Sequence, residues 1–341
     1  MRRALVALVV AAAAAGSMSA CQQEPDTTLV AFLLAGSNST RWEQWDEPSF
    51  RARVELTCPR CEYVTRNAEG DPATQVRQLD QVLADGADVI VLNAVTAERG
   101  EELVQTAGSV PVVAYDRFVA GADYYVSYDA DAIGLRMARA AVAGLEPRSG
   151  VLIVNGAQTD PNGVAIKKAV HQVLAAKRMK VLAELDPESW SADEARVWVE
   201  KQLAGRQTGV AAILAANDAQ AQGVAEALTA SGVGPRAWPV VTGQDADLEA
   251  LRRIVAGQQT LTVYKSFPRE AEQAADIAVA LATGGTVTGA EPVEGVDSFI
   301  FEPVVVTLQN LTDTVVRDGI YSTEQLCAGD LEERCTELGL R

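Results

Sequence analysis

Histidine is almost absent from this sequence. The 341 residues contain one, His171, which lies on a predicted helix with no cysteine or carboxylate pattern around it. A histidine-based catalytic triad or metal site needs more than this residue supplies. The sequence also lacks a Gly-Lys-Ser/Thr phosphate loop, and no Gly-x-Gly-x-x-Gly motif opens a helix. We therefore expect no metal, no cofactor and no enzymatic activity.

Basic residues are outnumbered by acidic ones. Lys and Arg together number 29 and Asp and Glu 46, so the formal net charge is −17 at pH 7. A balance this acidic argues against nucleic acid and against an anionic membrane surface as partners. A chain of this length is large for one core and is better accommodated by two domains.

The apolar run at the start of the chain, residues 4–15, is too short to span a bilayer, which takes roughly 20 residues. It follows two arginines and precedes small residues, which is the layout of a secretory signal over residues 1–20. Cys21 comes directly after Ser-Ala, as in a bacterial lipobox, so we expect its thiol to carry lipid and residues 21–28 to form a tether. A signal peptide with a chance cysteine is the alternative. We expect the protein on the outer face of the cell membrane.

Few cysteines remain after Cys21: Cys58, Cys61, Cys327 and Cys335. In an exported chain, an even number at close spacing favours disulfides, here Cys58–Cys61 and Cys327–Cys335. A zinc site and a thioredoxin-like redox pair are the alternatives. The redox pair is disfavoured because such pairs open a helix after a strand, whereas this one leads into a predicted strand.

Short apolar runs alternate with amphipathic stretches, a pattern typical of parallel sheets covered by helices on both faces. The first series predicts strands at 29–35, 63–65, 89–93, 110–115 and 124–128, with helices at 41–56, 72–86, 96–108 and 131–144. The second predicts strands at 151–155, 181–185, 210–215, 240–242 and 260–264, with helices at 163–177, 191–204, 217–230 and 245–256. A last helix (268–283) and strand (299–307) have no place in the completed second series. We therefore expect the chain to cross back, so that more than one connection joins the two lobes.

Polar side chains follow the predicted strands at their carboxyl ends, where open α/β sheets bind ligands. They are Arg41, Trp42, Asp116, Arg117, Asp160, Asn162, Trp190, Asn217, Asp218, Gln244, Asp245 and Lys265. Asp, Asn, Arg and Lys can pair the hydroxyls of a sugar, and an indole ring can cover its apolar C–H face. The alternative is structural: Asn217 can cap the next helix, and the tryptophans can be packing residues.

Several of these segments resemble the D-xylose-binding proteins of bacterial ABC sugar importers. The similar segments are Tyr115-Asp116-Arg117, Tyr124 to Asp129, Asn217-Asp218-Ala219, Gly243 to Leu248, Gly257 to Thr260, Val263-Tyr264-Lys265 and Asp313 to Gly319. The resemblance implies an α/β fold of the type I periplasmic-binding-protein kind, with two doubly wound parallel-sheet lobes joined by a three-crossover hinge. It implies sugar contacts at Arg41, Trp42, Asp116, Arg117, Asp160, Asn162, Trp190, Asn217, Asp245 and Lys265.

Taken together, these features predict a monomeric, lipid-anchored receptor that captures an aldose, D-xylose first, by lobe closure and hands it to an ABC permease and its ATPase. We expect one lobe at 29–129 plus 266–300, the other at 130–265 plus 301–325, and a tail at 326–341. One alternative is a sensory protein that reports sugar to a membrane receptor; another is a different aldose such as glucose, galactose or arabinose. A transcription repressor is disfavoured by the secretion signal, and an extracellular redox enzyme is the remaining rival.

Overall fold

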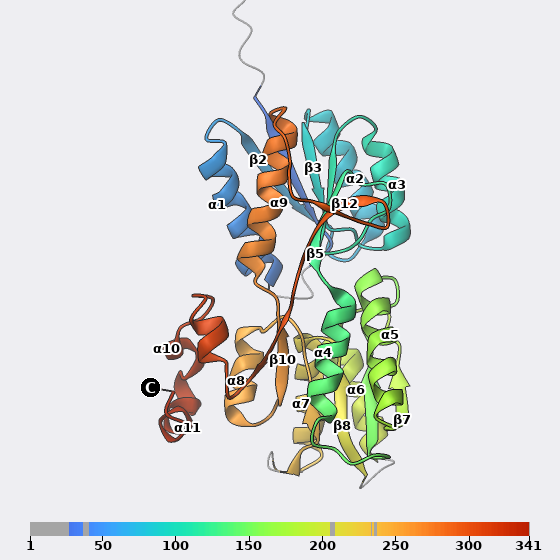
Figure 1. The fold of residues 1–341 in the computed structure, drawn as a ribbon, viewed down its shortest axis with the longest axis vertical. Helices are drawn as coiled ribbons and strands as arrows, with labels where there is room; N and C mark the ends of the chain where they lie inside the picture. Colours follow the sequence, from blue (N-terminus) through green and yellow to red (C-terminus); the bar gives the residue numbers. More distant parts are fainter. Residues whose placement is uncertain (1–26, 37–40, 205–208, 233, 235–236, 341) are drawn as a thin grey trace, which may run out of the picture.

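The computed structural model describes residues 27–36, 41–204, 209–232, 234 and 237–340. The predicted signal segment, Cys21 and most of the predicted tether lie outside these residues. In the described part, two α/β lobes lie one above the other (Figure 1). No helix in that part combines the length and the apolar character of a membrane span.

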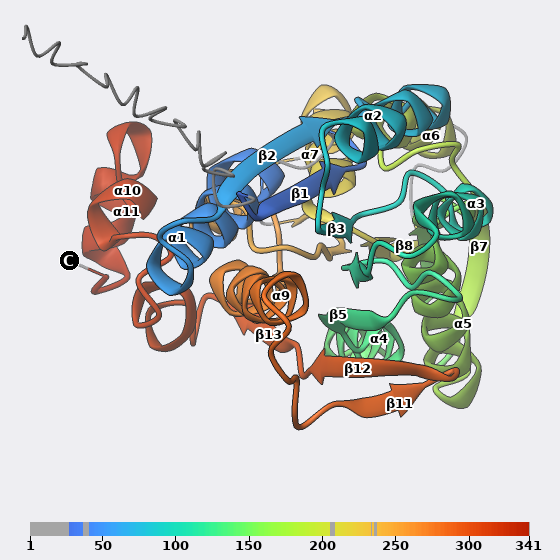
Figure 2. The same cartoon turned by 90° about the horizontal axis from the view of Figure 1, so that it is seen from above.

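The first lobe contains a seven-stranded sheet in the order β11-β12-β5-β4-β3-β1-β2, parallel except for the edge strand β11. Helices α1 and α9 cover one face and α2 and α3 the other (Figure 2). The elements are β1 (Leu29–Leu34), η1 (Trp42–Asp46), α1 (Glu47–Thr57), β2 (Glu62–Asn67), α2 (Pro72–Ala84), β3 (Val89–Leu92), α3 (Ala97–Ala107), β4 (Val112–Tyr115), β5 (Tyr124–Tyr128), α9 (Phe267–Ala282), β11 (Glu291–Val293) and β12 (Val296–Phe301).

The second lobe contains a parallel four-stranded sheet, β7-β6-β8-β9, and an antiparallel pair, β10-β13. Helices α4 and α5 pack on one core cluster, and α6 and α7 on another. The elements are α4 (Ala130–Val142), β6 (Gly150–Val154), α5 (Pro161–Ala176), β7 (Lys180–Leu185), α6 (Ala192–Ala204), β8 (Val210–Ala215), α7 (Asp218–Ala230), β9 (Val240–Val241), α8 (Leu248–Ala256), β10 (Leu261–Tyr264) and β13 (Val304–Thr307), followed by η3 (Thr312–Val316), α10 (Thr323–Leu326), η4 (Gly329–Leu331) and α11 (Glu332–Glu337).

Three connections join the lobes: β5 to α4, β10 to α9, and β12 to β13 (Figure 1). The Tyr128 hydroxyl accepts from the Ser266 N–H at 2.8 Å, and the Asp129 N–H donates to the Phe301 carbonyl at 3.0 Å. Each bond ties the first connection to another one, so the three form a single hinge. This is the predicted fold class.

The predicted strand 299–307 is wrong as a single element. It is two strands that belong to different lobes, β12 and β13, separated by Glu302 and Pro303. Proline has no N–H to donate to a sheet, so the ladder is interrupted where the chain crosses the hinge. The helix predicted from residue 245 begins only at Leu248, because Asp245 and Ala246 have positive φ angles of 101° and 59°.

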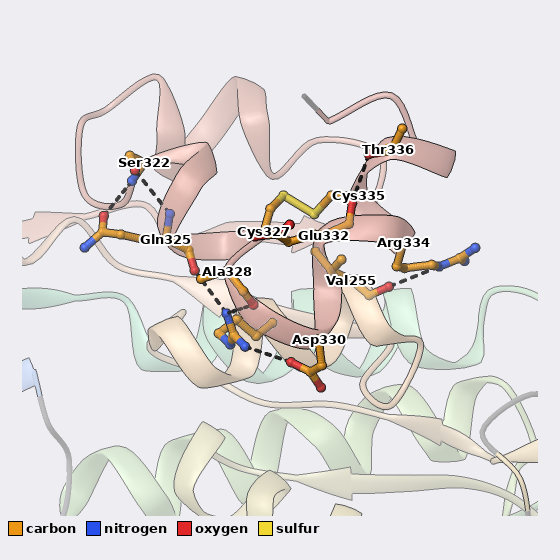
Figure 3. Close-up of a disulfide and its surroundings, with 11 residues drawn as sticks. Val255, Ser322, Gln325, Cys327, Ala328, Asp330, Glu332, Arg334, Cys335 and Thr336 are labelled. Carbon is orange, nitrogen blue, oxygen red and sulfur yellow. Dashed lines mark hydrogen bonds and ion pairs between the residues drawn. A yellow bond between two sulfur atoms is a disulfide. The ribbon is translucent and has the colours of Figure 1, made fainter.

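Two disulfides are present, and they are the predicted pairs. Cys58–Cys61 closes the turn between α1 and β2, and Cys327–Cys335 joins α10 to α11 beside α8 (Figure 3). Both sulfur atoms of the second pair belong to fully buried residues in an apolar cluster with Leu251 and Ile254 of α8. The residues predicted as a tail therefore pack against the second lobe as part of its core.

Candidate functional site

All ten predicted contact residues line one cavity between the lobes, together with Gln244. They come from the loops after β1, β4, β6, β7, β8, β9 and β10, because parallel strands of both sheets end at the cleft. The cavity is lined by three cations (Arg41, Arg117, Lys265) and three carboxylates (Asp116, Asp160, Asp245). The charges of the side chains that line the cavity therefore balance. The described residues contain no group of three or more side chains that could hold a metal ion.

Arg41 is the centre of the charged network and is only 1% exposed. Its guanidinium donates to Asp46 (Nε–Oδ2, 3.0 Å), to Asp116 (3.0 Å) and to Glu270 (2.9 Å). It also lies over the rings of Trp42 and Phe267, at 4.2 and 4.6 Å from their centroids. Burial opposes this charge, but the surrounding carboxylates outweigh it and hold the Arg41 pKa above its usual value.

Asp116 and Asp245 share Lys265. The ammonium lies 3.3 Å from Asp116 and 3.1 Å from Asp245, and all three side chains are buried. Burial raises the pKa of the Asp116 carboxyl, but Lys265 and Arg41 outweigh this effect and bring the pKa below its usual value. Asp116 is thus an ionised acceptor at neutral pH.

The backbone of Asp116 is left-handed, with φ +61°, which a non-glycine residue adopts only where its surroundings hold it. Its carbonyl accepts from Ser127 Oγ (2.7 Å), Asn162 Nδ2 (2.8 Å) and the Tyr125 hydroxyl (3.3 Å). The Asn162 bond comes from the other lobe. The conformation that aims Asp116 into the cavity is therefore stabilised by both lobes.

A second set of contacts closes the cleft around Asp160. This carboxylate caps α5 through the Asn162 N–H (2.9 Å), pairs with Arg117 across the lobes (2.7 Å) and accepts from the Trp190 indole N–H (3.2 Å). Arg117 in turn donates to the Ala94 carbonyl at 2.7 Å. The structure therefore has the lobes in contact, with Asp160 fixing the orientation of the Trp190 ring.

Asn217 has the structural role that the alternative interpretation assigns to it. Its side-chain oxygen accepts from the Gln220 N–H at 2.9 Å and caps α7. It also lines the cavity, so the two interpretations are compatible. Gln244, which follows a strand end but is absent from the contacts implied by the resemblance, lines the cavity as well.

The sequence did not predict three residues that contact the Arg41 guanidinium: Asp46, Glu270 and Phe267. Glu270 lies 229 positions from Arg41, in the first turn of α9. Nothing local marks these residues. The available signal was the amphipathic pattern of α9, in which a glutamate occupies a position on the buried face.

Glu270 predicts a pH effect on stability. Burial raises its pKa to about 8, although Arg41 and Lys265 oppose the shift. The folded protein then holds a proton that the unfolded chain, with a pKa of 4.5, has released, so the free energy of unfolding falls as pH rises from about 5 to 8. In Glu270→Gln, we expect the free energy of unfolding to fall by roughly 1–3 kcal/mol less over this pH range than it does in the wild type. Burial also raises the pKa of Asp218 to about 7, so the free energy of unfolding of the variant should still fall somewhat as pH rises.

Urea unfolding at pH 5, 6.5 and 8 measures the effect. Glu272→Gln, on the exposed side of the same helix, is the matched control and should keep the wild-type slope. An equally steep slope in Glu270→Gln would contradict the assignment.

Known proteins resemble the chain over most of its length. The model of the periplasmic binding protein domain matches residues 30–286. The D-xylose-binding periplasmic protein of Haemophilus influenzae is 33% identical over 273 residues, which is 76% of this chain and 81% of the relative. A multiple sugar-binding periplasmic receptor of Rhizobium radiobacter is 25% identical and covers 76% of this chain and 81% of its own length.

A solved structure shows the same fold. An ABC transporter solute-binding protein from Clostridium phytofermentans, with bound β-D-glucose, superposes with a TM-score of 0.78 over 88% of this chain and 100% of that one, at 24% identity. The chain therefore belongs to the periplasmic binding protein family, which consists of solute-binding proteins and not of enzymes. Within that family it belongs with the D-xylose-binding periplasmic proteins.

Proposed function

We propose that the protein is the extracytoplasmic binding component of an ABC importer and captures a monosaccharide, D-xylose, between its lobes. The observation that carries the proposal is a buried acceptor in the cavity, Gln244 Oε1, that accepts no hydrogen bond, next to Asp245 Oδ1, which pairs with the Lys265 ammonium but accepts no well-aligned hydrogen bond. A buried polar atom without a partner is costly. Sugar hydroxyls are the donors that this cleft needs.

The aromatic lining and the charge of the cavity agree with a neutral sugar. Trp42 and Trp190 both line it, are 6% and 9% exposed, and offer ring faces to the C–H surface of a pyranose. The balanced lining charges favour a neutral polyhydroxyl ligand over a sugar phosphate, which would add uncompensated negative charge. No lining residue need act as acid or base.

The choice of D-xylose rests on the relatives, which are named for that sugar at 33% and 31% identity. The glucose-bound neighbour makes a hexose the main competitor. Isothermal titration calorimetry of the folded protein against D-xylose, D-glucose, D-galactose, L-arabinose and D-ribose tests the choice. We expect 1:1 binding at micromolar or lower Kd for D-xylose, and silence across the panel would refute the simple-sugar proposal.

Replacing Asp245 should remove most of that affinity. Asp245→Ala deletes a buried carboxylate that faces the ligand and shares Lys265, so we expect about hundredfold weaker binding in the same titration. Asp80→Ala, on the exposed face of α2, is the control and should bind as the wild type does. Wild-type affinity in Asp245→Ala would place the ligand elsewhere.

We further propose that Cys21 carries the lipid that anchors a monomeric receptor to the outer face of the membrane. The ABC permease and its ATPase would receive the sugar from the closed form. A sensing role is the second candidate, because one relative is named a receptor. Loss of sugar uptake in cells lacking this protein supports transport, and intact uptake with a lost sugar response supports sensing.

A further inference from the structure

The C-terminal segment, residues 308–340, is fixed to the second lobe. Its apolar residues pack with α8 in one cluster, and the Cys327–Cys335 disulfide lies inside that cluster. Arg252 of α8 donates to the carbonyls of Gln325 (3.2 Å) and Ala328 (3.0 Å) and pairs with Asp330 (3.2 Å). Figure 3 shows the disulfide and labels Gln325, Ala328 and Asp330, the residues of the segment that Arg252 contacts. The segment must therefore move with the second lobe.

One residue of this segment reaches the first lobe. The Tyr321 hydroxyl accepts from the Trp45 indole N–H at 3.2 Å, and the two rings meet edge to face, with centroids 5.6 Å apart and planes at 86°. Tyr321 is 4% exposed. Trp45 packs on the cluster of α8 and the C-terminal segment, whereas Trp42 and Phe50 on either side of it belong to the core of the first lobe.

Trp45 lies on the turn that carries the ligand contacts. η1 is a single π-helical turn, a form that often occurs at functional sites. Arg41 and Trp42 are at its start and face the cavity, and Asp46, which pairs with Arg41, is at its end. The start of this turn thus lines the cavity, while Trp45, further along it, contacts the second lobe.

We propose that Tyr321 is a positioning residue for ligand binding: it holds Trp45, and with it the Arg41–Trp42 turn, in the ligand-binding arrangement of the closed lobes. The inference rests on the proposed function. Because the contact joins the lobes, it stabilises the closed form, and the apparent Kd rises when the closed form is less populated. The Cys327–Cys335 disulfide restricts the conformations of the segment and so helps to fix the position of Tyr321.

Calorimetry with D-xylose tests the proposal. Tyr321→Ala removes both the ring contact and the acceptor, and we expect about tenfold weaker binding. Tyr321→Phe keeps the ring and should lose about threefold, and Trp45→Phe, which removes only the N–H donor and part of the ring, should lose a similar amount. Trp198→Phe, a partly buried tryptophan of α6, is the matched control and should bind as the wild type does. Wild-type affinity in folded Tyr321→Ala would overturn the proposal.

Hydrogen exchange of the sugar-free protein gives a readout that does not depend on the ligand. Tyr321→Ala should speed exchange in residues 41–50 and leave β3 and β8 at wild-type protection. Unchanged protection of 41–50 would overturn the proposal, as would faster exchange without weaker binding. If the wild type binds none of the sugars, the proposed function fails, and the exchange result alone decides whether Tyr321 holds the turn.

Discussion

Arg41→Met is expected to lower the free energy of unfolding by about 3–5 kcal/mol, because it removes the cation that pairs with Asp46 and Asp116 in a buried network. Asp46 loses an ion pair at 2.5 Å, and Asp116 loses the one at 3.0 Å while Lys265 remains at 3.3 Å; these side chains are all buried. Glu270 loses less stabilising interaction with Arg41 at neutral pH, since its pKa of about 8 keeps it largely protonated and uncharged. The loss should therefore be larger at pH 8 than at pH 6.

Arg53→Met is the matched control for this measurement. Arg53 also makes a two-pronged ion pair, with Asp276 at 2.7 and 2.8 Å, but both partners are partly exposed. Pairs of this kind contribute about 1 kcal/mol or less. Urea unfolding of both variants at pH 6 and 8 decides the matter, and equal losses in the two would show that Arg41 does not hold the network together.

Gly156→Ala is expected to weaken sugar binding by tenfold or more while leaving the protein folded. A Cβ at this position would lie 2.2 Å from Trp190 Cη2 and 2.7 Å from two further ring carbons. The indole must then leave the wall of the cavity, and its hydrogen bond to Asp160 is lost. On the proposed function, we expect ring stacking and this bond together to contribute about 1 kcal/mol or more to sugar binding.

Two companion variants make the result specific to the Trp190 ring. Gly144→Ala adds a methyl group where no atom lies within 4 Å, so its affinity should equal that of the wild type. Gly156→Ala combined with Trp190→Phe removes the clash and should bind more tightly than Gly156→Ala alone. If Gly156→Ala bound D-xylose as the wild type does, the Trp190 ring would have no part in the site.

That the candidate contact residues line one cavity was predictable, because they follow a rule that depends on the backbone alone. Strand after strand ends in polar residues, and parallel strands bring those ends to one edge. The cap of α7 was equally visible: Asn217 follows a predicted strand and accepts from the Gln220 N–H, as the local sequence indicates. The stretch 299–307 was predicted as one strand, although the predicted lobe boundary at 300/301 falls inside it, because an apolar run looks the same on either side of a hinge.

The residues that hold the cavity-lining side chains in place could not be predicted from the sequence. Glu270 and Arg41 meet only because α9 returns to the first lobe through the second crossover, which also places Phe267 against the guanidinium. The same holds for Trp45 and Tyr321, 276 positions apart. Residues of ordinary type at such separations carry no local pattern from which a contact can be inferred.

The sequence by itself determined most of the elements, the two-lobed α/β class and the set of polar residues at the strand ends. These depend on hydrophobic periodicity, helix capping and strand direction, which act over a few residues. Only the tertiary structure decided which charges neutralise one another, which acceptors in the cleft remain without a donor, and which side chains join the lobes. Those outcomes depend on distances of about 3 Å between residues far apart in the chain, and packing alone sets such distances.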